Sequence, residues 1–329
     1  MDYIVLDLEW NQSASGKEDS VEHLPFEIIE IGAVKLDGDA GFAQTGEFRR
    51  LIRPQVYKQL HYKILEVTHM DVGELKSKGR TFKQVIREFL DWCGTDFCFC
   101  TWGSMDLTEL QRNMDYFGVP IPFARPLLYY DVQKLYCLEY GDGKNKLSLD
   151  QAVKERGIDQ ERPFHRALDD AFYTGRVLAA MDFSQVRPYI SVDYYRLPET
   201  REEELTLRFP DYYKYVSRTF TNREEAVKDK AVNDMVCPYC NRMLRKKVRW
   251  FPYGQRLCYG LAACPEHGLV RGKLRIKKAE YGGTYVVKTM KAATDEEAEL
   301  ILQKKEEGRR KRNIKNHTKK HRNGTAKDL

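Results

Sequence analysis

The first 180 residues alternate between strand-like and helix-like patterns of apolar positions, which predicts an α/β domain. Runs rich in Val, Ile, Phe and Trp predict strands over 3–10, 26–36, 48–52, 97–102 and 127–132. Apolar residues three and four positions apart predict helices over 81–92, 104–117, 148–156 and 168–181. Because hairpin-connected strands come first and helices separate the later ones, we expect a mixed five-stranded sheet flanked by helices.

The pattern changes after this domain, which we expect to span residues 1–183. Residues 184–235 combine helical and aromatic-rich stretches, and we interpret them as a largely helical connector. Residues 236–294 contain short β-like stretches between cysteines, which is typical of a small sheet held together by a metal ion. Residues 295–329 begin with a helix-compatible segment and continue from Gly308 with few apolar residues, so this tail is expected to be disordered unless bound.

Composition indicates a soluble protein that is large enough for two domains. Of the 329 residues, 42% are hydrophobic and 32% are charged. No run approaches the ~18 to 20 uncharged apolar residues that a membrane-spanning helix needs. The N-terminus carries Asp2, Asp7 and Glu9, which is not the pattern of a signal peptide. We therefore expect a cytoplasmic protein that does not associate with membranes.

The formal net charge of +6 is distributed unevenly along the chain. Residues 1–230 carry 31 Lys and Arg against 39 Asp and Glu, a net charge of −8. Residues 231–329 carry 24 against 10, a net charge of +14. This asymmetry favours an acidic site in the first part and a polyanion-binding surface in the second, with a solvated tail as the alternative for the second.

Five titratable side chains lie on or beside the expected elements of the first domain. Asp7 and Glu9 are two positions apart on the first strand, so their side chains point to the same face. Asp106 follows the fourth strand, and His165 and Asp170 lie at the start of the last helix. Paired carboxylates in an apolar strand are costly without a cation. The pattern therefore favours a divalent metal site over a strand end exposed to solvent.

The same residues resemble the motifs of DEDDh-type 3′–5′ exonucleases, a family that includes ribonuclease T and the proofreading subunit of the bacterial replicative polymerase. Asp7-Leu-Glu9 is similar to the first motif and Asp106 to the second. His165 and Asp170 match the H-x4-D of the third motif, and residues 27–35 resemble the family's second strand. The resemblance covers about the first 183 residues and implies a ribonuclease H-like fold for them.

One branch of this family is the most similar. Trp102-Gly-x-x-Asp106-x-x-x-Leu110, followed by Asp131-Val-Gln-Lys-Leu135, resembles the exonucleases that trim RNA 3′ ends, including those that act on histone mRNA and small RNAs. The resemblance therefore implies hydrolysis from the 3′ end of nucleic acid, with single-stranded RNA preferred over DNA and nucleoside 5′-monophosphates as products.

The resemblance also implies roles for the five residues. Asp7, Glu9, Asp106 and Asp170 would hold two Mg²⁺ or Mn²⁺ ions, and His165 would take a proton from the attacking water. Two alternatives remain open. One is an exonuclease that trims or proofreads DNA, and the other is a non-catalytic protein that binds RNA or ribosomes on an exonuclease scaffold.

Nearby residues receive structural interpretations. Asp169 points about 100° away from Asp170 on a helix, so we interpret it as a surface residue. His61 and His69 are interpreted as packed or surface histidines. Trp10 could equally be a core residue or stack on the terminal base of a nucleic acid. None of these is counted among the site residues.

The eight cysteines form two groups. The first, Cys93, Cys98, Cys100 and Cys137, lies in apolar surroundings and predicts buried free thiols. In the second, Cys237-Pro-Tyr-Cys240 and Cys264-Pro-Glu-His267 are two pairs with the x2 spacing of zinc ligands, 23 residues apart. We therefore predict one structural Zn²⁺ held by Cys237, Cys240, Cys264 and His267. Cys258 is an alternative to either of the last two.

Basic residues surround this metal site. Arg271, Lys273, Arg275 and Lys277 occupy every second position of an expected strand, which would place them on one face. Such a stripe suits a nucleic-acid backbone. The tail adds two basic clusters, at 309–312 and 319–322, as a mobile arm for ribosomes or ribosomal RNA or as a solvated terminus.

Overall fold

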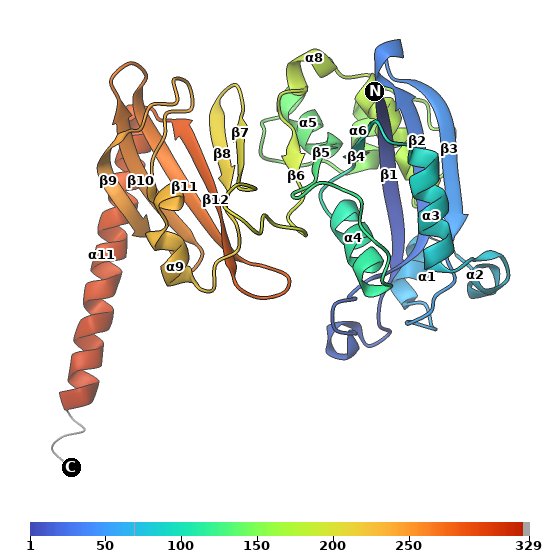
Figure 1. The fold of residues 1–329 in the computed structure, drawn as a ribbon, viewed down its shortest axis with the longest axis horizontal. Coiled ribbons are helices and arrows are strands. Elements are labelled where there is room, and N and C mark those ends of the chain that lie inside the picture. The colour runs from blue at the N-terminus through green and yellow to red at the C-terminus, as the bar shows by residue number, and fades with distance from the viewer. Residues whose placement is uncertain (69, 325–329) are drawn as a thin grey trace. The chain divides into compact units, whose positions relative to one another are not determined.

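The chain divides into two units, the first ending at Arg196 and the second beginning at Leu197, and Figure 1 shows their ribbons. The computed structural model describes residues 1–68 and 70–324, except for the side chains of residues 17, 18 and 311–324. The observed boundary differs from the predicted ones. Residues 184–196 complete the first unit, and residues 197–235 belong to the second.

The first unit contains a mixed sheet of strand order β3-β2-β1-β4-β5-β6. Its strands are β1 (Asp2–Asn11), β2 (Glu27–Asp37), β3 (Ala43–Leu51), β4 (Phe97–Thr101), β5 (Leu128–Asp131) and β6 (Ser191–Val192). β1 runs antiparallel to β2 and parallel to β4, so the predicted mixed sheet is confirmed. β6, a strand of two residues on the edge, is additional to the five that the sequence predicts.

Helices cover both faces of this sheet. They are α1 (Tyr62–Thr68), α2 (Val72–Lys78), α3 (Phe82–Cys93), α4 (Asp106–Tyr116), α5 (Val132–Glu139), α6 (Leu149–Glu155), α7 (Ala167–Ala179) and α8 (Phe183–Val186), with short 3-10 turns η1 (Gly16–Asp19) and η2 (Gly38–Ala40). One apolar cluster joins α3 and α4 to Ile4, Leu6 and Leu8 of β1. The other joins α5, α6 and α7 to Tyr3 and Val5 of the same strand. Because side chains alternate along β1, Asp7 and Glu9 continue the face that carries α7.

Helix caps agree with the sequence where the signals are strong. Thr81 and Gln84 form a capping box that starts α3, and Ser148 and Gln151 form another that starts α6. α5 was not predicted as a helix, because it follows β5 without a break. Its signal is Asp131, whose carboxylate accepts a hydrogen bond from the amide of Lys134 at 2.9 Å as an N-cap.

Gly32 of β2 allows α7 to begin directly against the sheet. It is the cross-strand partner of Asp7. A Cβ at this position would come within 2.0 Å of the amide nitrogen of Leu168 and 2.1 Å of the carbonyl carbon of Ala167. Only glycine therefore lets the start of α7 approach Asp7 so closely.

Replacing Gly32 with alanine is expected to push the start of α7 off the sheet. We expect the free energy of unfolding to fall by about 1–3 kcal/mol, as for other overpacked sites. Thermal unfolding measures the effect. Gly46→Ala on β3 is the matched control, because its Cβ would meet nothing closer than 3.5 Å. Equal changes in Tm for the two variants would argue against the close approach.

The second unit contains an antiparallel sheet of strand order β7-β8-β12-β11-β10-β9. Its strands are β7 (Leu205–Arg208), β8 (Tyr212–Val216), β9 (Arg245–Pro252), β10 (Leu257–Cys264), β11 (Gly268–Lys278) and β12 (Thr284–Ala292). Its helices are α9 (Arg223–Lys228), α10 (Lys230–Asn233) and α11 (Asp295–Gly324). The β-rich module predicted over 236–294 is thus part of a larger sheet.

The predicted helical connector over 184–235 differs from the structure, which places β7 and β8 within it. Tyr213 and Tyr215 are buried in the core of the second unit, and Tyr212 and Lys214 alternate with them on the opposite face. This period of two is a strand signal, but over five residues it is too short to outweigh the helical segments around it. β10 was missed because Gly260, Ala262 and Ala263 have low strand propensity.

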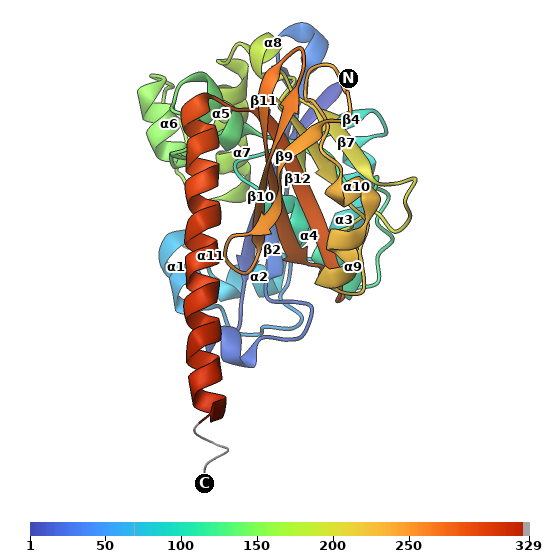
Figure 2. The ribbon, with the colours of Figure 1, turned by 90° about the vertical axis from the view of Figure 1, so that its left-hand side faces the viewer.

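The two faces of the second sheet are covered differently. The core lies on the face that carries α9 and α10, whereas Ala298 and Ile301 of α11 pack on the opposite face against Val248, Phe251 and Leu261. Beyond this contact α11 continues past the sheet (Figures 1 and 2). The helix includes residues 308–324, where the composition predicts disorder, and the abundance of Lys, Arg, Glu and Gln favours helix over most of its length. Among the described residues, no helix is long and apolar enough to span a membrane.

Candidate active site and candidate metal centre

β1 brings two carboxylates to one face of the first sheet. Asp7 and Glu9 are half-buried and follow Tyr3 and Val5 on the side that faces α7. The pairing of β1 with β2 shifts register between Glu9 and Trp10, so the strand departs from a regular ladder just after the acidic pair. Such irregularities are common beside functional sites, because they change the direction of side chains.

Asp106 is fixed to the same strand by a hydrogen bond. It is the first residue of α4, its side chain is buried, and its Oδ1 accepts a hydrogen bond from the amide of Leu8 at 3.2 Å. Leu8 lies between Asp7 and Glu9, so this bond holds the start of α4 beside the acidic pair. The sequence prediction that Asp106 follows a buried strand at a helix start is confirmed.

His165 and Asp170 are linked at the start of α7. The amide of His165 donates to both carboxylate oxygens of Asp170, at 3.2 and 3.3 Å. His165 has a φ of 69°, a left-handed conformation that non-glycine residues adopt rarely and at some energetic cost. His165 is exposed and lines the cleft, so the strained turn leaves it accessible to solvent.

The cleft brings all five predicted residues together. Ligand oxygens of Asp7, Glu9 and Asp170 lie within 4.8 Å of one another. Asp106 is outside that group but lines the same cleft of about 480 Å³, as does His165. The five residues predicted from the sequence therefore line one cleft, and three of the four carboxylates, those of Asp7, Glu9 and Asp170, lie closest together.

The pKa values of all four carboxyl groups are raised. Burial raises the pKa of Asp7 well above its usual range, and the charges of Asp106, Glu9 and Asp170 add to the effect. Burial, followed by the charges of Asp170 and Glu30, raises the pKa of Glu9 to about 8. Burial also raises the pKa of Asp106 to about 7 and that of Asp170 to about 6, although backbone N–H groups oppose both shifts. These shifts express mainly the cost of burying a charged carboxylate, to which the neighbouring acids add repulsion.

A divalent cation fits this donor set. Hard cations such as Mg²⁺ and Mn²⁺ prefer carboxylate oxygens, and a bound cation would offset both the burial of the charges and their mutual repulsion. The three acids of the tight group each offer an oxygen toward a common centre. The residues present are therefore suited to divalent metal ions.

The metal-free protein is expected to lose stability as the pH rises. Because the pKa of Glu9 is raised from 4.5 to about 8 in the fold, the folded protein binds more protons than the unfolded chain between those values. In EDTA the free energy of unfolding should therefore fall as the pH rises through this window. Mg²⁺ should raise Tm more at about pH 8 than at about pH 5, because it binds ionised carboxylates. Thermal unfolding with and without Mg²⁺ at both pH values measures this.

Two outcomes would contradict that expectation. One is a Mg²⁺-induced rise in Tm of the same size at both pH values. The other concerns the variant Asp7→Asn, which lacks one of the repelling charges. We expect this variant to be more stable than the wild type in EDTA at the higher pH. A less stable variant under those conditions would show that the acids do not repel one another as described.

A buried ion cluster that sequence reasoning missed supports the site. Glu30 is the cross-strand partner of Glu9, and its side chain is inaccessible to solvent. It accepts a hydrogen bond from Arg49 Nε at 2.6 Å and two from Arg166, at 3.1 and 3.2 Å. Arg166 is the N-cap residue of α7, next to His165. Glu30 therefore anchors the start of α7 to β2, and a charged residue between the apolar residues of the strand was the available signal.

Other residues in the cleft complete its walls. Trp10, Trp102, Met105, Gln133 and Lys146 line it, and Lys146 is 3.0 Å from Asp131 in an ion pair. Met105 is 48% exposed and adds an apolar side chain to the wall of the cleft. None of these was named as a site residue, because each has a common structural role that composition does not distinguish.

The structure also places the residues that were given structural interpretations. Asp169 points to Arg162, at 3.7 Å, and not into the cleft. His61 is buried and its amide donates to Asn11 at 2.9 Å, as a packed histidine does. Trp10 packs against Phe26 and also lines the cleft. His69 lies outside the described residues.

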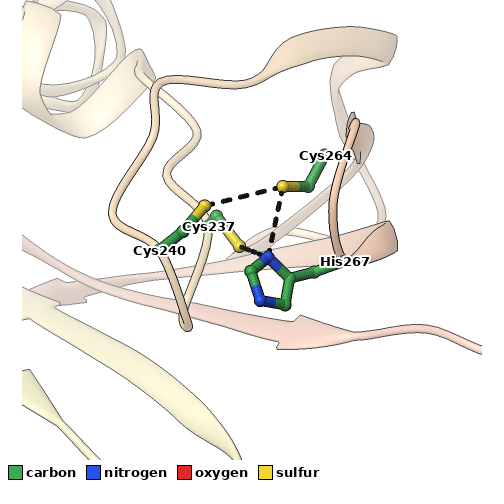
Figure 3. A group of neighbouring side chains, drawn as sticks. All are labelled: Cys237, Cys240, Cys264 and His267. Carbon is green, nitrogen blue, oxygen red and sulfur yellow. Dashed lines mark hydrogen bonds between the residues drawn. The ribbon is translucent and has the colours of Figure 1, made fainter.

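A second cluster of possible ligands lies in the second unit (Figure 3). Cys237 and Cys240 come from the turn before β9, Cys264 ends β10, and His267 lies in the turn to β11. The Sγ atoms of Cys240 and Cys264 are 3.6 Å apart, and His267 Nδ1 is 3.5 Å from Cys264 Sγ and 3.7 Å from Cys237 Sγ. Four donors at these separations surround a single point.

These separations fit zinc. Ligands at about 2.0–2.3 Å from a tetrahedral Zn²⁺ lie roughly 3.3–3.8 Å from one another, which includes the three distances observed. Backbone N–H groups of residues 239 and 240 donate to Cys237 Sγ, and those of 266 and 267 to Cys264 Sγ, which orients the sulfurs. Cys258 is not in the cluster. It is buried in the core of the unit, with Arg223 Nη2 at 3.9 Å.

The first group of cysteines agrees with its prediction. Cys93, Cys98, Cys100 and Cys137 are free thiols, buried or half-buried in the first unit. Burial raises the pKa of Cys93 and Cys98 to about 12, so these thiols are protonated at neutral pH.

A family model described as exonuclease, of the RNase T type, matches residues 4–178. This range is more than half of the chain and contains Asp7, Glu9, Asp106, His165 and Asp170. No curated protein sequence matches the chain at a significant level.

Several solved structures are similar to the chain. The nuclease domain of 3′hExo, a DEDDh family member bound to rAMP, is 21% identical, with a TM-score of 0.48, and the match covers 58% of this chain and 96% of that one. A 3′-exonuclease with the histone mRNA stem-loop is 22% identical, with a TM-score of 0.46, over 55% and 80%. S. pombe Pop2p in a Mg²⁺- and Mn²⁺-bound form is 15% identical, with a TM-score of 0.42, over 55% and 82%.

Proposed function

This chain belongs to the RNase T family of exonucleases, and on that basis we propose that it removes nucleotides stepwise from the 3′ end of single-stranded RNA and releases nucleoside 5′-monophosphates. The observation that carries the proposal is the convergence of Asp7, Glu9 and Asp170 within 4.8 Å, in a cleft that also holds Asp106 and His165. A scaffold without activity would have no physical reason to keep these costly groups together.

The four carboxylates would hold two divalent cations, Mg²⁺ or Mn²⁺. Such ions supply a nucleophilic water near neutral pH and neutralise the charge that develops on the phosphate. Asp7 interacts electrostatically with Asp106, Glu9 and Asp170, so it would be a ligand in contact with the charge of every other acid of the site. Asp106 faces the group from the start of α4.

His165 would act as the general base. Imidazole exchanges protons near neutral pH, and the exposed position of His165 in the cleft gives water access to it. Its amide bonds to Asp170, so one turn fixes both the base and a metal ligand. Arg166, held by Glu30, keeps this turn in place as a positioning residue.

His165→Asn is expected to lower kcat by about 10²- to 10⁴-fold, the usual contribution of a general base, while Mg²⁺ binding is retained. Asparagine is the most informative replacement, because it tolerates the left-handed φ of 69° but cannot act as a base. The measurement pairs the hydrolysis rate with the Mg²⁺-induced shift in Tm. Unchanged kcat would remove His165 from the mechanism.

RNA preference and 3′ polarity are tested with matched single-stranded RNA and DNA oligonucleotides labelled at either end. A 5′ label should pass through a ladder of shortened products, whereas a 3′ label should appear at once as mononucleotide, with RNA digested faster than DNA. The RNA-trimming branch that the Trp102-to-Leu110 motif resembles supports this ranking. Faster digestion of DNA would favour a DNA-trimming or proofreading enzyme. Binding without any digestion would favour the RNA- or ribosome-binding scaffold.

The second unit would hold one structural Zn²⁺ through Cys237, Cys240, Cys264 and His267. The spacing of the four donors supports this, and a site with four protein ligands leaves no position for substrate. Its role would be to join the turn before β9 to the turn between β10 and β11.

A further inference from the structure

A basic groove lies beside α11, on the face of the second sheet that is opposite its core. It has a volume of about 420 Å³. Six cationic side chains and a single acidic one line it. The cations are Lys214, Arg271, Lys273, Arg275, Lys291 and Lys304. The groove lies in the second unit, whereas the acidic cleft is built entirely from the first.

The alternation of β11 creates this face. Val270, Leu274 and Ile276 point into the core, so Arg271, Lys273 and Arg275 share the opposite side. Residues two apart on a strand are about 6.8 Å apart, which makes the three cations a regular row. The stripe predicted from the sequence is therefore present on the face opposite the core.

Neighbouring strands extend the row sideways. Lys273 is paired with Tyr259 on β10 and with Thr289 on β12, and Thr289 is paired in turn with Lys214 on β8. Side chains of directly paired residues point to the same side of a sheet. Cations are thus displayed across several strands, and they form an extended surface.

α11 covers only one side of this face. Its apolar residues pack on β9 and β10, and the next turn brings Lys304 over the ring of Tyr259, with Nζ 4.7 Å from the centroid. Lys273 approaches the same ring at 5.9 Å. Tyr259 therefore holds two ammonium groups together at the wall of the groove.

Two of the cations in the groove form ion pairs, and the cations also lie close to one another. Arg271 pairs with Glu297 at 3.1 Å, and Lys291 pairs with Asp211 at 2.6 Å. Burial, together with the charges of Arg275, Lys304 and Arg271, lowers the pKa of Lys273. Crowded cations of this kind cost free energy, which a bound anion would recover.

We propose that this groove binds the phosphodiester backbone of a nucleic-acid strand as a second site, separate from the catalytic cleft. An extended row of cations on three strands suits a linear polyanion better than a single phosphate, which two or three donors satisfy. The choice of nucleic acid as the polyanion rests on the proposed function, because the occupant belongs to the same class as the substrate. The second unit then contributes affinity for the strand.

The test measures binding of a fluorescent single-stranded RNA to full-length protein carrying Asp7→Asn, which prevents digestion. In that background, Lys273→Gln with Lys304→Gln should weaken binding at least about tenfold and flatten its dependence on salt, because two phosphate contacts are lost. The matched control is Lys278→Gln with Lys305→Gln. It removes the same charge from the same strand and helix, at exposed positions that do not line the groove. The control should bind like the parent.

Equal weakening by both pairs would overturn the proposal, because net charge alone would then explain binding. Equal affinity for an inorganic polyphosphate chain would overturn the assignment to nucleic acid. The double variant Lys273→Gln with Lys304→Gln is checked for folding by circular dichroism. If it does not fold, the single variants Arg275→Gln, in the groove, and Lys278→Gln, outside it, are compared instead, because both residues are exposed. Hydrolysis by the chain with an intact Asp7 is measured separately, so a failure of the groove and a failure of the exonuclease proposal remain distinct.

Discussion

Asp7→Asn is expected to reduce kcat for hydrolysis of single-stranded RNA by about a thousandfold or more, without unfolding the protein. Asp7 has ligand oxygens of Glu9 and Asp170 within 4.8 Å and also interacts electrostatically with Asp106. Asparagine keeps the size of the side chain but loses the charge that holds a cation. Since the wild-type acids repel one another, the variant should lose activity and gain stability in EDTA.

The matched control for this prediction is Asp169→Asn. Asp169 is the sequence neighbour of Asp170 but pairs with Arg162 and does not line the cleft, so its removal should change kcat less than about threefold. Steady-state kinetics of the two variants, with Mg²⁺ varied, separate loss of metal binding from loss of chemistry. A fully active Asp7→Asn protein, or an Asp169→Asn protein that is equally impaired, would place the metal elsewhere.

Removal of zinc is expected to unfold the second unit and leave the first folded. Structural zinc sites contribute on the order of 10–16 kcal/mol of apparent binding free energy, and the two units have separate cores. Cys240→Ser should therefore lose stoichiometric zinc and the unfolding transition of residues 197–329. Elemental analysis and calorimetry measure the two effects, and the first unit should keep its own transition.

Cys258→Ala is the matched control, because Cys258 is a buried cysteine of the same unit that lies outside the cluster. It should keep one equivalent of zinc and lose only the few kcal/mol, at most, that a small cavity costs. A Cys258→Ala protein without zinc would assign the fourth ligand differently. A Cys240→Ser protein that keeps both zinc and its transition would show that the cluster is a group of free thiols.

Most of the first unit could be predicted from sequence because its signals are local. Residues 3–10 are rich in β-branched and aromatic residues, which favour a strand, and Thr81 and Ser148 begin helices with capping boxes. The positions of Asp7, Glu9, Asp106, His165 and Asp170 follow from strand ends and helix starts, which a single sequence reveals. The grouping of Asp7, Glu9 and Asp170, with Asp106 slightly apart, required coordinates.

What could not be predicted depends on contacts between distant residues. Glu30, Arg49 and Arg166 are separated by up to 136 positions, and only the register of β1 and β2 shows that Glu30 faces Glu9. Gly32 is one glycine among many until α7 is seen to touch it. β7 and β8 are too short to be recognised without β12 beside them. Local sequence patterns predict the longer helices and strands, whereas short strands form only where a neighbouring strand pairs with them.

The most direct test of the account is whether the hydrolysis of RNA to nucleotides depends on a metal ion. Purified full-length protein is incubated with single-stranded RNA in Mg²⁺, in EDTA, and in EDTA followed by excess Mg²⁺, and the products are separated by chromatography. The account predicts nucleoside 5′-monophosphates with Mg²⁺, none in EDTA, and full recovery when Mg²⁺ is restored. Release that continues in EDTA, or products that carry a 3′-phosphate, would contradict a metal-dependent exonuclease built on these four carboxylates.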